Sequence, residues 1–224
     1  MSNWQFFKKI LQETKRGKGF GRTLFNLLID GRKFGGKILD IGGGKDRSSV
    51  YRFLKLEAGT TVKKADINPE FEPDYLVNME KDTLPVADNY FDNIFSFALI
   101  EHLASHQHLL KEVYRLLKPG GIFAASMPFL ANFHPDPHDY IRFSKEKIEL
   151  VLKGAGFKDI KIEEVGKGPF TASWYLLEFI FPWWLRLVFA PSALSLDYLL
   201  QKIKPKINFK EKYPIGYYFE AKKL

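Results

Sequence analysis

Between residues 37 and 165, short apolar runs alternate with amphipathic stretches, a pattern that predicts strands separated by helices. The expected strands lie at 38–41, 61–65, 75–77, 93–97, 122–126 and 157–165. Helices are expected at 48–56, at 105–117 and after Ser144, the last of them ending at Gly154 and Gly156. Strands that recur with helices between them favour an α/β fold with a mostly parallel sheet covered on both faces.

The two ends of the chain and the segment 169–207 depart from this rhythm. Short helical patterns at 4–14 and 23–28 make residues 1–34 an N-terminal helical segment. Residues 169–207 are rich in aromatic and aliphatic side chains and form an aromatic helical insert. The alternating stretch 213–222 predicts a closing strand, so the α/β domain is expected to comprise 35–168 and 208–224.

Composition fits one substantial core with appendages, because 46% of the 224 residues are hydrophobic. The chain has no cysteine, which excludes disulfides, thiolate-rich metal sites and a cysteine nucleophile, and suits a reducing cytoplasm. The start lacks the unbroken apolar run of a secretory signal, so a cytoplasmic location is expected, including the inner face of the membrane.

The formal charge of +8 is unevenly distributed. Residues 1–37 contain nine Lys or Arg against two acids, and residues 201–224 contain seven against two. The basic ends could meet phosphate groups of lipid or nucleic acid, or simply form a solvated surface.

A strand followed by three glycines at 42–44 lets the backbone approach a ligand closely. A dinucleotide fingerprint would need a third spaced glycine where Arg47 stands, and a phosphate loop would need Ser or Thr where Asp46 stands. Both interpretations are therefore disfavoured.

Two aspartates narrow the choice of ligand. Asp40, just before the glycines, can meet the ammonium of an amino acid or hold the loop through its amides, and it would repel a pyrophosphate. Asp66, at the end of the next long strand, can accept hydrogen bonds from both hydroxyls of a ribose. Each alone is more often a turn former or cap. Together they describe a nucleoside that carries a cationic amino acid.

Five motifs follow one another in the chain. They are Ile38-Leu39-Asp40-Ile41-Gly42-Gly43-Gly44, Asp66, Leu84-Pro85-Val86-Ala87-Asp88-Asn89-Tyr90-Phe91-Asp92, Glu101-His102 and Leu116-Leu117-Lys118-Pro119-Gly120-Gly121. In this order they resemble the class I S-adenosylmethionine-dependent methyltransferases of type 11. The resemblance covers about 37–165. It implies a Rossmann-like three-layer αβα sandwich whose seven-stranded sheet ends in an antiparallel strand, with S-adenosylmethionine as cofactor.

The resemblance also implies a set of cofactor-binding residues. Gly42, Gly43 and Gly44 would flank the methionine part beside Asp40, and Asp66 with Ile67 would hold the ribose. The adenine would lie near Asn78, Met79 and Glu80, with Phe97 and Ala98 closing the pocket. The family often has glycine where Asp46 stands, and either Asn78 or Glu80 could be the polar residue beside the adenine.

The loop 133–143 is the expected acceptor site, because it follows a strand at the carboxyl edge of the sheet. If the acceptor is a hydroxyl, His134, His138 and Asp139 are candidates to remove or orient its proton, while Tyr140 and Arg142 would bind the acceptor. The alternative is that these side chains only fix the loop. No metal is expected, because Pro135 and Pro137 give poor ligand spacing.

The loop resembles one in methyltransferases that accompany cell-surface polysaccharide and glycolipid synthesis. The leading hypothesis is therefore O-methylation of a small-molecule or lipid-linked glycan acceptor. The alternatives are a non-catalytic cofactor-binding module that acts through a partner or membrane, and an RNA methyltransferase steered by the basic ends. Nucleic acid is a weaker expectation, since the motif of amino-group methylation, Asn/Asp-Pro-Pro-Tyr/Phe, is missing.

The aromatic helical insert contains Glu178, Pro182 and Arg186, so it makes a poor membrane span. Its tryptophans and the lysines at 202, 204 and 206 suit a helix in the headgroup layer. A lid or a homodimer surface is the alternative.

Overall fold

The computed structural model describes residues 3–44 and 49–224, which form two compact units. The helical unit comprises residues 1–30, 129–132 and 164–217, and the sheet unit comprises residues 31–128, 133–163 and 218–224. Two strands of the main sheet, β8 and β9, run across the boundary between them. Each unit is described by itself.

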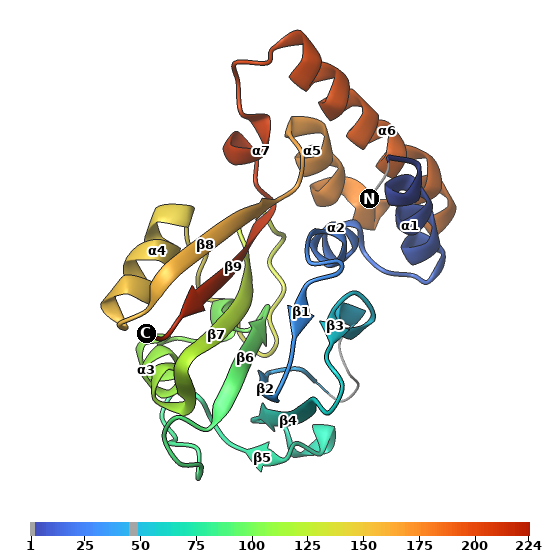
Figure 1. The fold of residues 1–224 in the computed structure, drawn as a ribbon. Helices are drawn as coiled ribbons and strands as arrows, with labels where there is room; N and C mark the ends of the chain where they lie inside the picture. Colours follow the sequence, from blue (N-terminus) through green and yellow to red (C-terminus); the bar gives the residue numbers. More distant parts are fainter. Residues whose placement is uncertain (1–2, 45–48) are drawn as a thin grey trace. The chain divides into compact units, whose positions relative to one another are not determined.

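A seven-stranded sheet organises the sheet unit, in the order β5-β4-β2-β6-β7-β9-β8 (Figure 1). The strands are β2 (Lys37–Ile41), β4 (Thr61–Asp66), β5 (Tyr75–Leu76), β6 (Phe91–Phe97), β7 (Leu117–Pro128), β8 (Lys158–Val165) and β9 (Gly216–Lys222). The pairs from β5 to β7 are parallel, whereas the last strand, β9, is antiparallel. This topology confirms the predicted Rossmann-like sandwich.

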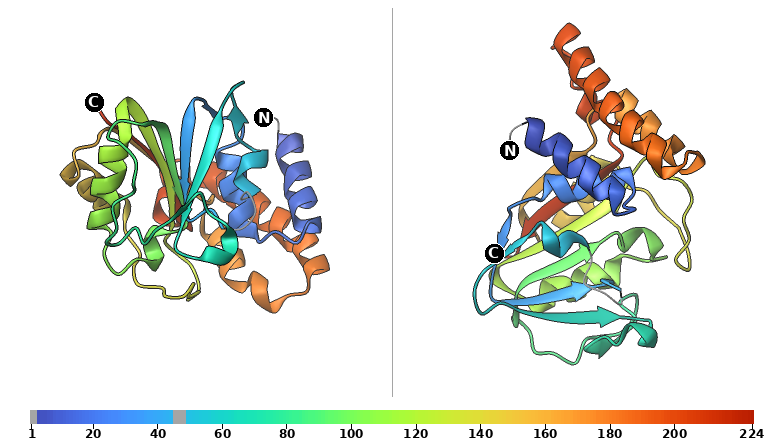
Figure 2. Two further views of the ribbon diagram at one scale, coloured as in Figure 1. Left: turned by 90° about the horizontal axis from the view of Figure 1, so that it is seen from below. Right: turned by 90° about the vertical axis from the view of Figure 1, so that its right-hand side faces the viewer.

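The central strands are apolar on both faces, as expected of a parallel sheet covered by helices. Leu39, Ile94, Phe95 and Ala124 are completely buried. The helices α3 (Gln107–Leu116) and α4 (Lys145–Gly154) pack on one face of the sheet, as the left view of Figure 2 shows. Ser144 caps α4, because its hydroxyl accepts a hydrogen bond from the Lys147 N–H, which confirms the predicted helix start.

The helix predicted at 48–56 is wrong for the described part of that stretch. A single 3-10 turn, η1 (Ser49–Arg52), is followed by the short strand β3 (Lys55–Leu56), which pairs in parallel with β1 (Lys33–Phe34). Hydrogen bonds to the preceding segment compete with helix continuation, since the Gly31 N–H donates to the Phe53 carbonyl at 2.8 Å. Two further 3-10 turns, η2 (Pro69–Phe71) and η3 (Ile100–His102), follow β4 and β6.

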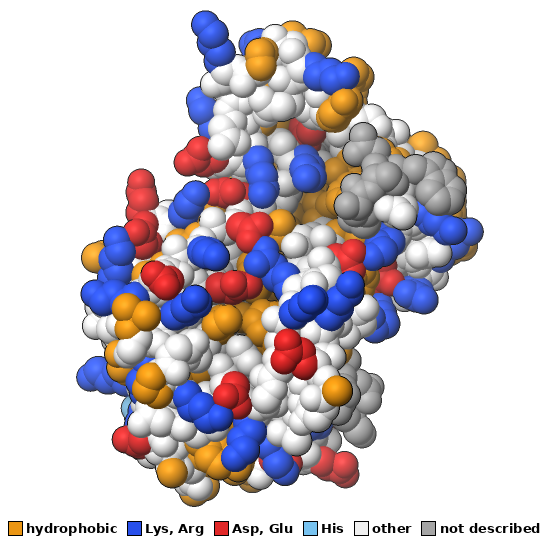
Figure 3. All heavy atoms as spheres, viewed as in Figure 1, with side chains coloured by type: hydrophobic (Ala, Val, Ile, Leu, Met, Phe, Trp, Pro, Cys, Tyr) orange, Lys and Arg blue, Asp and Glu red, His pale blue; other side chains and the backbone are white. Residues whose placement is uncertain are grey.

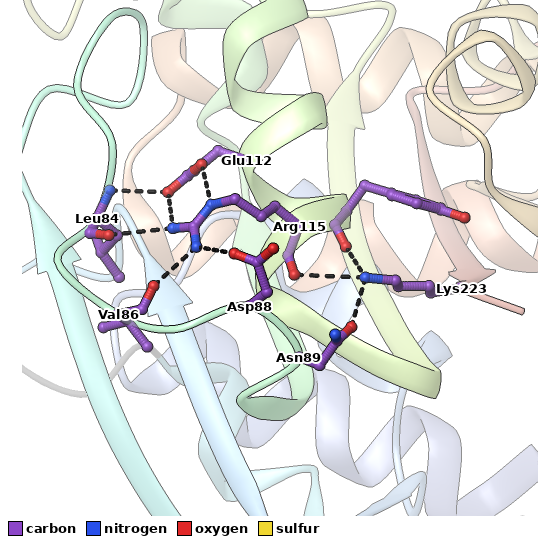
Figure 4. Close-up of polar contacts among 8 residues, drawn as sticks. Leu84, Val86, Asp88, Asn89, Glu112, Arg115 and Lys223 are labelled. Atoms are coloured by element: carbon purple, nitrogen blue, oxygen red, sulfur yellow. Dashed lines mark hydrogen bonds and ion pairs between the residues drawn. The ribbon is translucent and has the colours of Figure 1, made fainter.

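Arg115 ties the loop before β6 to α3 (Figure 4). Its guanidinium donates to the carbonyls of Leu84 and Val86 and to the carboxylate of Asp88, at 3.1, 2.8 and 2.6 Å. Glu112, one turn earlier on α3, accepts a hydrogen bond from the Arg115 guanidinium and another from the Leu84 N–H, the latter at 2.8 Å. The motif at 84–92 therefore has a structural basis, which is to fix the entry into β6.

The helical unit is built from α1 (Asn3–Lys15), α2 (Phe20–Leu28), α5 (Pro169–Leu177), α6 (Trp183–Ile203) and α7 (Phe209–Lys212), with the 3-10 turn η4 (Glu178–Ile180). Within it, α6 packs against α1 and α5. Glu178 caps α2 by accepting the Phe20 N–H, and Asp197 caps α5 by accepting the Thr171 N–H. In the part of the chain that the structure describes, we find no helix with the length and apolarity to cross a membrane.

Candidate functional site

The predicted cofactor residues meet at one edge of the sheet unit. Because β4, β2, β6 and β7 are parallel, their carboxyl ends lie side by side, at Asp66, Ile41, Phe97 and Pro128. This edge is where α/β sheets bind their ligands.

The glycine loop crosses this edge in close contact with its neighbours. Gly42 has a φ of +73°, and its N–H donates to the Ala65 carbonyl at 2.9 Å. A Cβ on Gly42 would lie 2.9 Å from Cδ1 of Leu99, and a Cβ on Gly43 would lie 2.5 Å from Oδ2 of Asp40. The glycines thus let the chain pass over a carboxylate at a distance that no side chain permits. Asp46, the departure from the family pattern, lies outside the described residues.

Asp40 lies beneath this loop as a buried carboxylate. Its side chain accepts a 2.7 Å hydrogen bond from the Tyr51 hydroxyl. Burial, with a smaller contribution from the nearby charge of Asp66, raises the pKa of Asp40 to about 6, while Tyr51 and Lys64 oppose the shift. A buried carboxylate in this state favours a cation beside it, so the position suits the ammonium of an amino acid.

Asp66 and Ile67 offer a polar and an apolar surface at the end of β4. One carboxylate oxygen of Asp66, Oδ1, accepts the Asn68 N–H at 3.0 Å. Its other oxygen has no hydrogen-bond partner among the described residues and can accept from a ligand hydroxyl. Ile67 is 61% exposed.

The turn after β5 is held by its own side chains. Asn78 accepts the Glu80 N–H through its side-chain oxygen at 2.9 Å, and Glu80 accepts the Ser105 N–H at 3.1 Å. Met79, the residue between them in the sequence, has a buried side chain. Asn78 therefore shapes the backbone of this turn, and Glu80 connects the turn to the segment at Ser105.

Ala98 closes the edge with an unusual backbone. Its φ is +56°, a left-handed conformation that is costly for a residue with a Cβ and is concentrated at functional sites. Its N–H donates to both the carbonyl and the hydroxyl of Ser126, each at 3.2 Å. Phe97, directly before it, is buried.

In the loop 133–143, Asp139 is bound by two neighbours. Arg142 pairs with both of its carboxylate oxygens, and the His134 N–H donates to it at 3.0 Å. The Arg142 hydrogen bonds hold the pKa of Asp139 well below its usual range, although the side chain is only 2% exposed. This ion pair favours a positioning role for Asp139 over proton acceptance.

His102 joins this loop from η3. Its Nδ1 lies 2.6 Å from the His138 carbonyl, and its ring meets that of His134 edge to face at 5.4 Å. The Tyr140 N–H donates to the Glu101 carbonyl at 2.8 Å. His138 itself contributes its carbonyl here, while its ring is exposed and packs on Tyr140.

Glu101, His102 and His134 offer ligand atoms within 4.8 Å of one another, a spacing compatible with a metal ion. Arg142 opposes that use, because its Nη2 lies 3.5 Å from Nδ1 of His134 and brings a positive charge to the group. That no metal is needed stays a prediction.

Sequence reasoning did not identify Tyr51, Leu99 and Ser126 as neighbours of the site. Nothing local marks them, since each reaches the site only through tertiary packing. His102 is different, because it stands in the motif Glu101-His102 and could have been chosen from the resemblance.

Comparisons with known proteins agree with this geometry. A family model described as a methyltransferase domain matches residues 39–125. A 2-methyl-6-phytyl-1,4-hydroquinone methyltransferase of rice is 25% identical over 58% of this chain and 41% of its own length. A ubiquinone/menaquinone biosynthesis C-methyltransferase of Haemophilus ducreyi is 33% identical over 43% of each chain. The chain thus spans less than half the length of these two relatives.

Solved structures show the same fold. An S-adenosylmethionine-dependent methyltransferase from Archaeoglobus fulgidus superposes with a TM-score of 0.54 at 20% identity, over 90% of this chain and 94% of that one. A phosphoethanolamine N-methyltransferase of Haemonchus contortus, in complex with S-adenosylmethionine, gives 0.51 at 22% identity, over 89% and 52%. Residues 39–125 thus match a methyltransferase domain, and the fold is the one found in these S-adenosylmethionine-dependent methyltransferases.

Proposed function

We propose that this protein transfers a methyl group from S-adenosylmethionine to a small molecule that carries a large apolar part. The proposal of S-adenosylmethionine as cofactor rests on the close contact of Gly43 with Asp40, and on Asp66 at the carboxyl end of the neighbouring parallel strand. Asp40 would meet the amino-acid end of the cofactor, and Asp66 would accept hydrogen bonds from its ribose. The cofactor supplies an electrophilic methyl group on a sulfonium.

The acceptor half rests on two kinds of support. Relatives of this chain are named for a phytyl hydroquinone, a sterol and a malonyl-acyl-carrier protein, so the relatives' acceptors are largely apolar or acyl compounds. The loop 133–143 adds imidazoles near the sheet edge, which suits a hydroxyl as the reacting group. A lipid-linked glycan with a free hydroxyl meets both conditions.

The chain's own residues can manage the proton of such a hydroxyl. With Nδ1 of His102 donating to the His138 carbonyl, its Nε2 is left as a proton acceptor. Asp139 holds the main chain of His134 and the guanidinium of Arg142 in place. Catalysis by this site would consist mainly of alignment for in-line displacement, with His102 or His134 taking the proton.

Calorimetry with S-adenosylhomocysteine tests the cofactor half. Binding to the wild type, abolished in Asp66→Ala and retained in the control Glu149→Ala on the exposed face of α4, would support the proposal. Failure of the folded wild type to bind would overturn it.

Methyl transfer from labelled S-adenosylmethionine to fractions of a cell extract tests the acceptor half. Label in the lipid fraction is the expected result. Label only in RNA would overturn the acceptor class, and binding without any transfer would favour a non-catalytic module.

A further inference from the structure

The helix α6 presents an apolar face to solvent. Its buried residues Ala190, Ala193, Leu194 and Asp197 lie on one side and pack within the helical unit. At helical spacing, the opposite side carries Trp184, Val188, Leu199 and Ile203, which are 55%, 60%, 52% and 74% exposed. Between 183 and 201 that side has no charged residue. An uncharged outward face of this length is unusual for a helix in water.

The turn before α6 and the start of the helix carry further exposed apolar side chains. Phe179 and Ile180 of η4 are 62% and 74% exposed, and Trp183 at the start of α6 is 59% exposed. We call the surface formed by Trp184, Val188, Leu199 and Ile203 the outer α6 face. Covering it would remove several large side chains from water, each a favourable change.

The exposed charges of the segment 169–210 have one sign. Only two acids occur between 169 and 210, Glu178 and Asp197, and both are 1% exposed because they cap α2 and α5. The exposed charges at the end of α6 are lysines at 202, 204 and 206. Figure 3 shows Lys and hydrophobic side chains together over the C-terminal part of α6. The surface is thus complementary to an anionic partner and repels a second copy of itself.

A cavity beside the outer α6 face, which shares Leu199 with it, also combines apolar and basic side chains. It measures about 660 Å³, and its lining includes Phe6, Phe7, Leu194 and Tyr198 together with Lys167, Lys210 and the Asp197 carboxylate, which caps α5. Burial lowers the pKa of Lys167, and the charge of Lys210 lowers it further. Two ammonium groups beside an aromatic and aliphatic wall suit an anionic headgroup with an apolar chain.

We propose that the outer α6 face binds the surface of an anionic lipid bilayer. Trp184 would lie at headgroup depth, the aliphatic side chains would reach the acyl boundary and the lysines would meet lipid phosphates. The helix lies in the interface and does not cross it, in line with the absence of any membrane-spanning helix among residues 3–44 and 49–224. The proposal needs neither cofactor nor acceptor and is independent of the methyl-transfer function.

Co-sedimentation with vesicles tests it on the full chain. The wild type is expected to sediment with phosphatidylcholine vesicles that contain phosphatidylglycerol, and much less with phosphatidylcholine alone. Trp184→Ser with Val188→Ser should weaken the binding by about tenfold or more. Lys202→Gln with Lys204→Gln should weaken it by about tenfold on the anionic vesicles only, because each lysine contributes through charge.

Leu76→Ser with Leu150→Ser is the matched control, since these side chains are 62% and 63% exposed in the sheet unit. This pair should bind vesicles like the wild type, and circular dichroism should show native helix content in every variant. A wild type that stays in the supernatant would overturn the proposal. So would light scattering that finds a dimer dissociated by Trp184→Ser with Val188→Ser, or RNA that displaces the protein from vesicles.

Discussion

The hydroxyl of Tyr51 donates a 2.7 Å hydrogen bond to Oδ2 of Asp40, and the same oxygen lies 2.5 Å from where a Cβ on Gly43 would stand. The buried carboxylate therefore has the glycine loop against it and a phenol beside it. Because Asp40 is 3% exposed, each neighbour has a large effect on its charge.

Tyr51→Phe removes the hydroxyl that donates to this carboxylate. We expect the pKa of Asp40 to rise further and affinity for S-adenosylhomocysteine to fall about tenfold at neutral pH, since a hydrogen bond to a charged group contributes about 1.5–3 kcal/mol. Calorimetry at pH 7 and pH 8 measures the effect. Equal affinity of variant and wild type at both values would contradict it.

Asp40→Asn should stabilise the ligand-free protein while abolishing cofactor binding. The pKa of Asp40 in the folded protein is raised to about 6, so folding is most favourable at low pH, where Asp40 is protonated. The protein loses stability as the pH rises from about 4 to about 6 and Asp40 ionises in the unfolded state before it does in the folded state. Above that window the loss is constant at roughly 2–3 kcal/mol. Urea unfolding of both proteins from pH 4 to pH 8 tests this, and a constant difference across the range would count against it.

Gly43→Ala should abolish cofactor binding in a protein that still folds, because its Cβ would displace the Asp40 carboxylate or the loop. The control is Gly154→Ala at the end of α4, where nothing lies within 4 Å of the added Cβ. This change should be neutral or stabilise by about 0.5–1 kcal/mol. Binding and melting temperature are measured for both. The steric argument fails if Gly43→Ala binds like the wild type.

Arg115→Met should lower the free energy of unfolding by about 2 kcal/mol. The substitution leaves the Glu112 carboxylate, which is 5% exposed, without the Arg115 guanidinium that pairs with it. It also removes the hydrogen bonds that tie the loop at 84–88 to α3. Arg115→Lys keeps the charge but not the several directed hydrogen bonds and should recover only part of the loss. Denaturant titration checks both, and full recovery by lysine would show that charge alone matters.

Arg142→Gln should make the stability of the fold depend less on pH in the acidic range. In the wild type the pKa of Asp139 is lowered by Arg142, so this pair stabilises the fold above the ordinary carboxyl pKa and the benefit is lost as the pH falls. We expect a loss of about 1 kcal/mol at pH 7, small because the guanidinium is partly exposed, and a loss that shrinks as the pH falls below about 4. Melting temperatures at several pH values decide it. A loss independent of pH would mean that packing dominates.

Much of the site was predictable because it lies where local patterns end. Asp40, Gly42 and Asp66 follow strands whose apolar runs are visible in the sequence, and parallel strands bring such ends together. The wrong helix at 48–56 shows the limit. Its amphipathic pattern was present, but the pairing of β3 with β1 and the Gly31 hydrogen bond to Phe53 outcompeted it.

The sequence by itself determined the class of fold, the order of motifs and the absence of thiol chemistry, since these follow from periodicity, spacing and residue types. Only the tertiary structure decided that Tyr51 supports Asp40, that Arg142 occupies Asp139 and that His102 meets His134. It also decided that both acids near α6 are buried while its apolar side faces solvent. Burial and pairing depend on which distant segments pack together, and no local pattern encodes them.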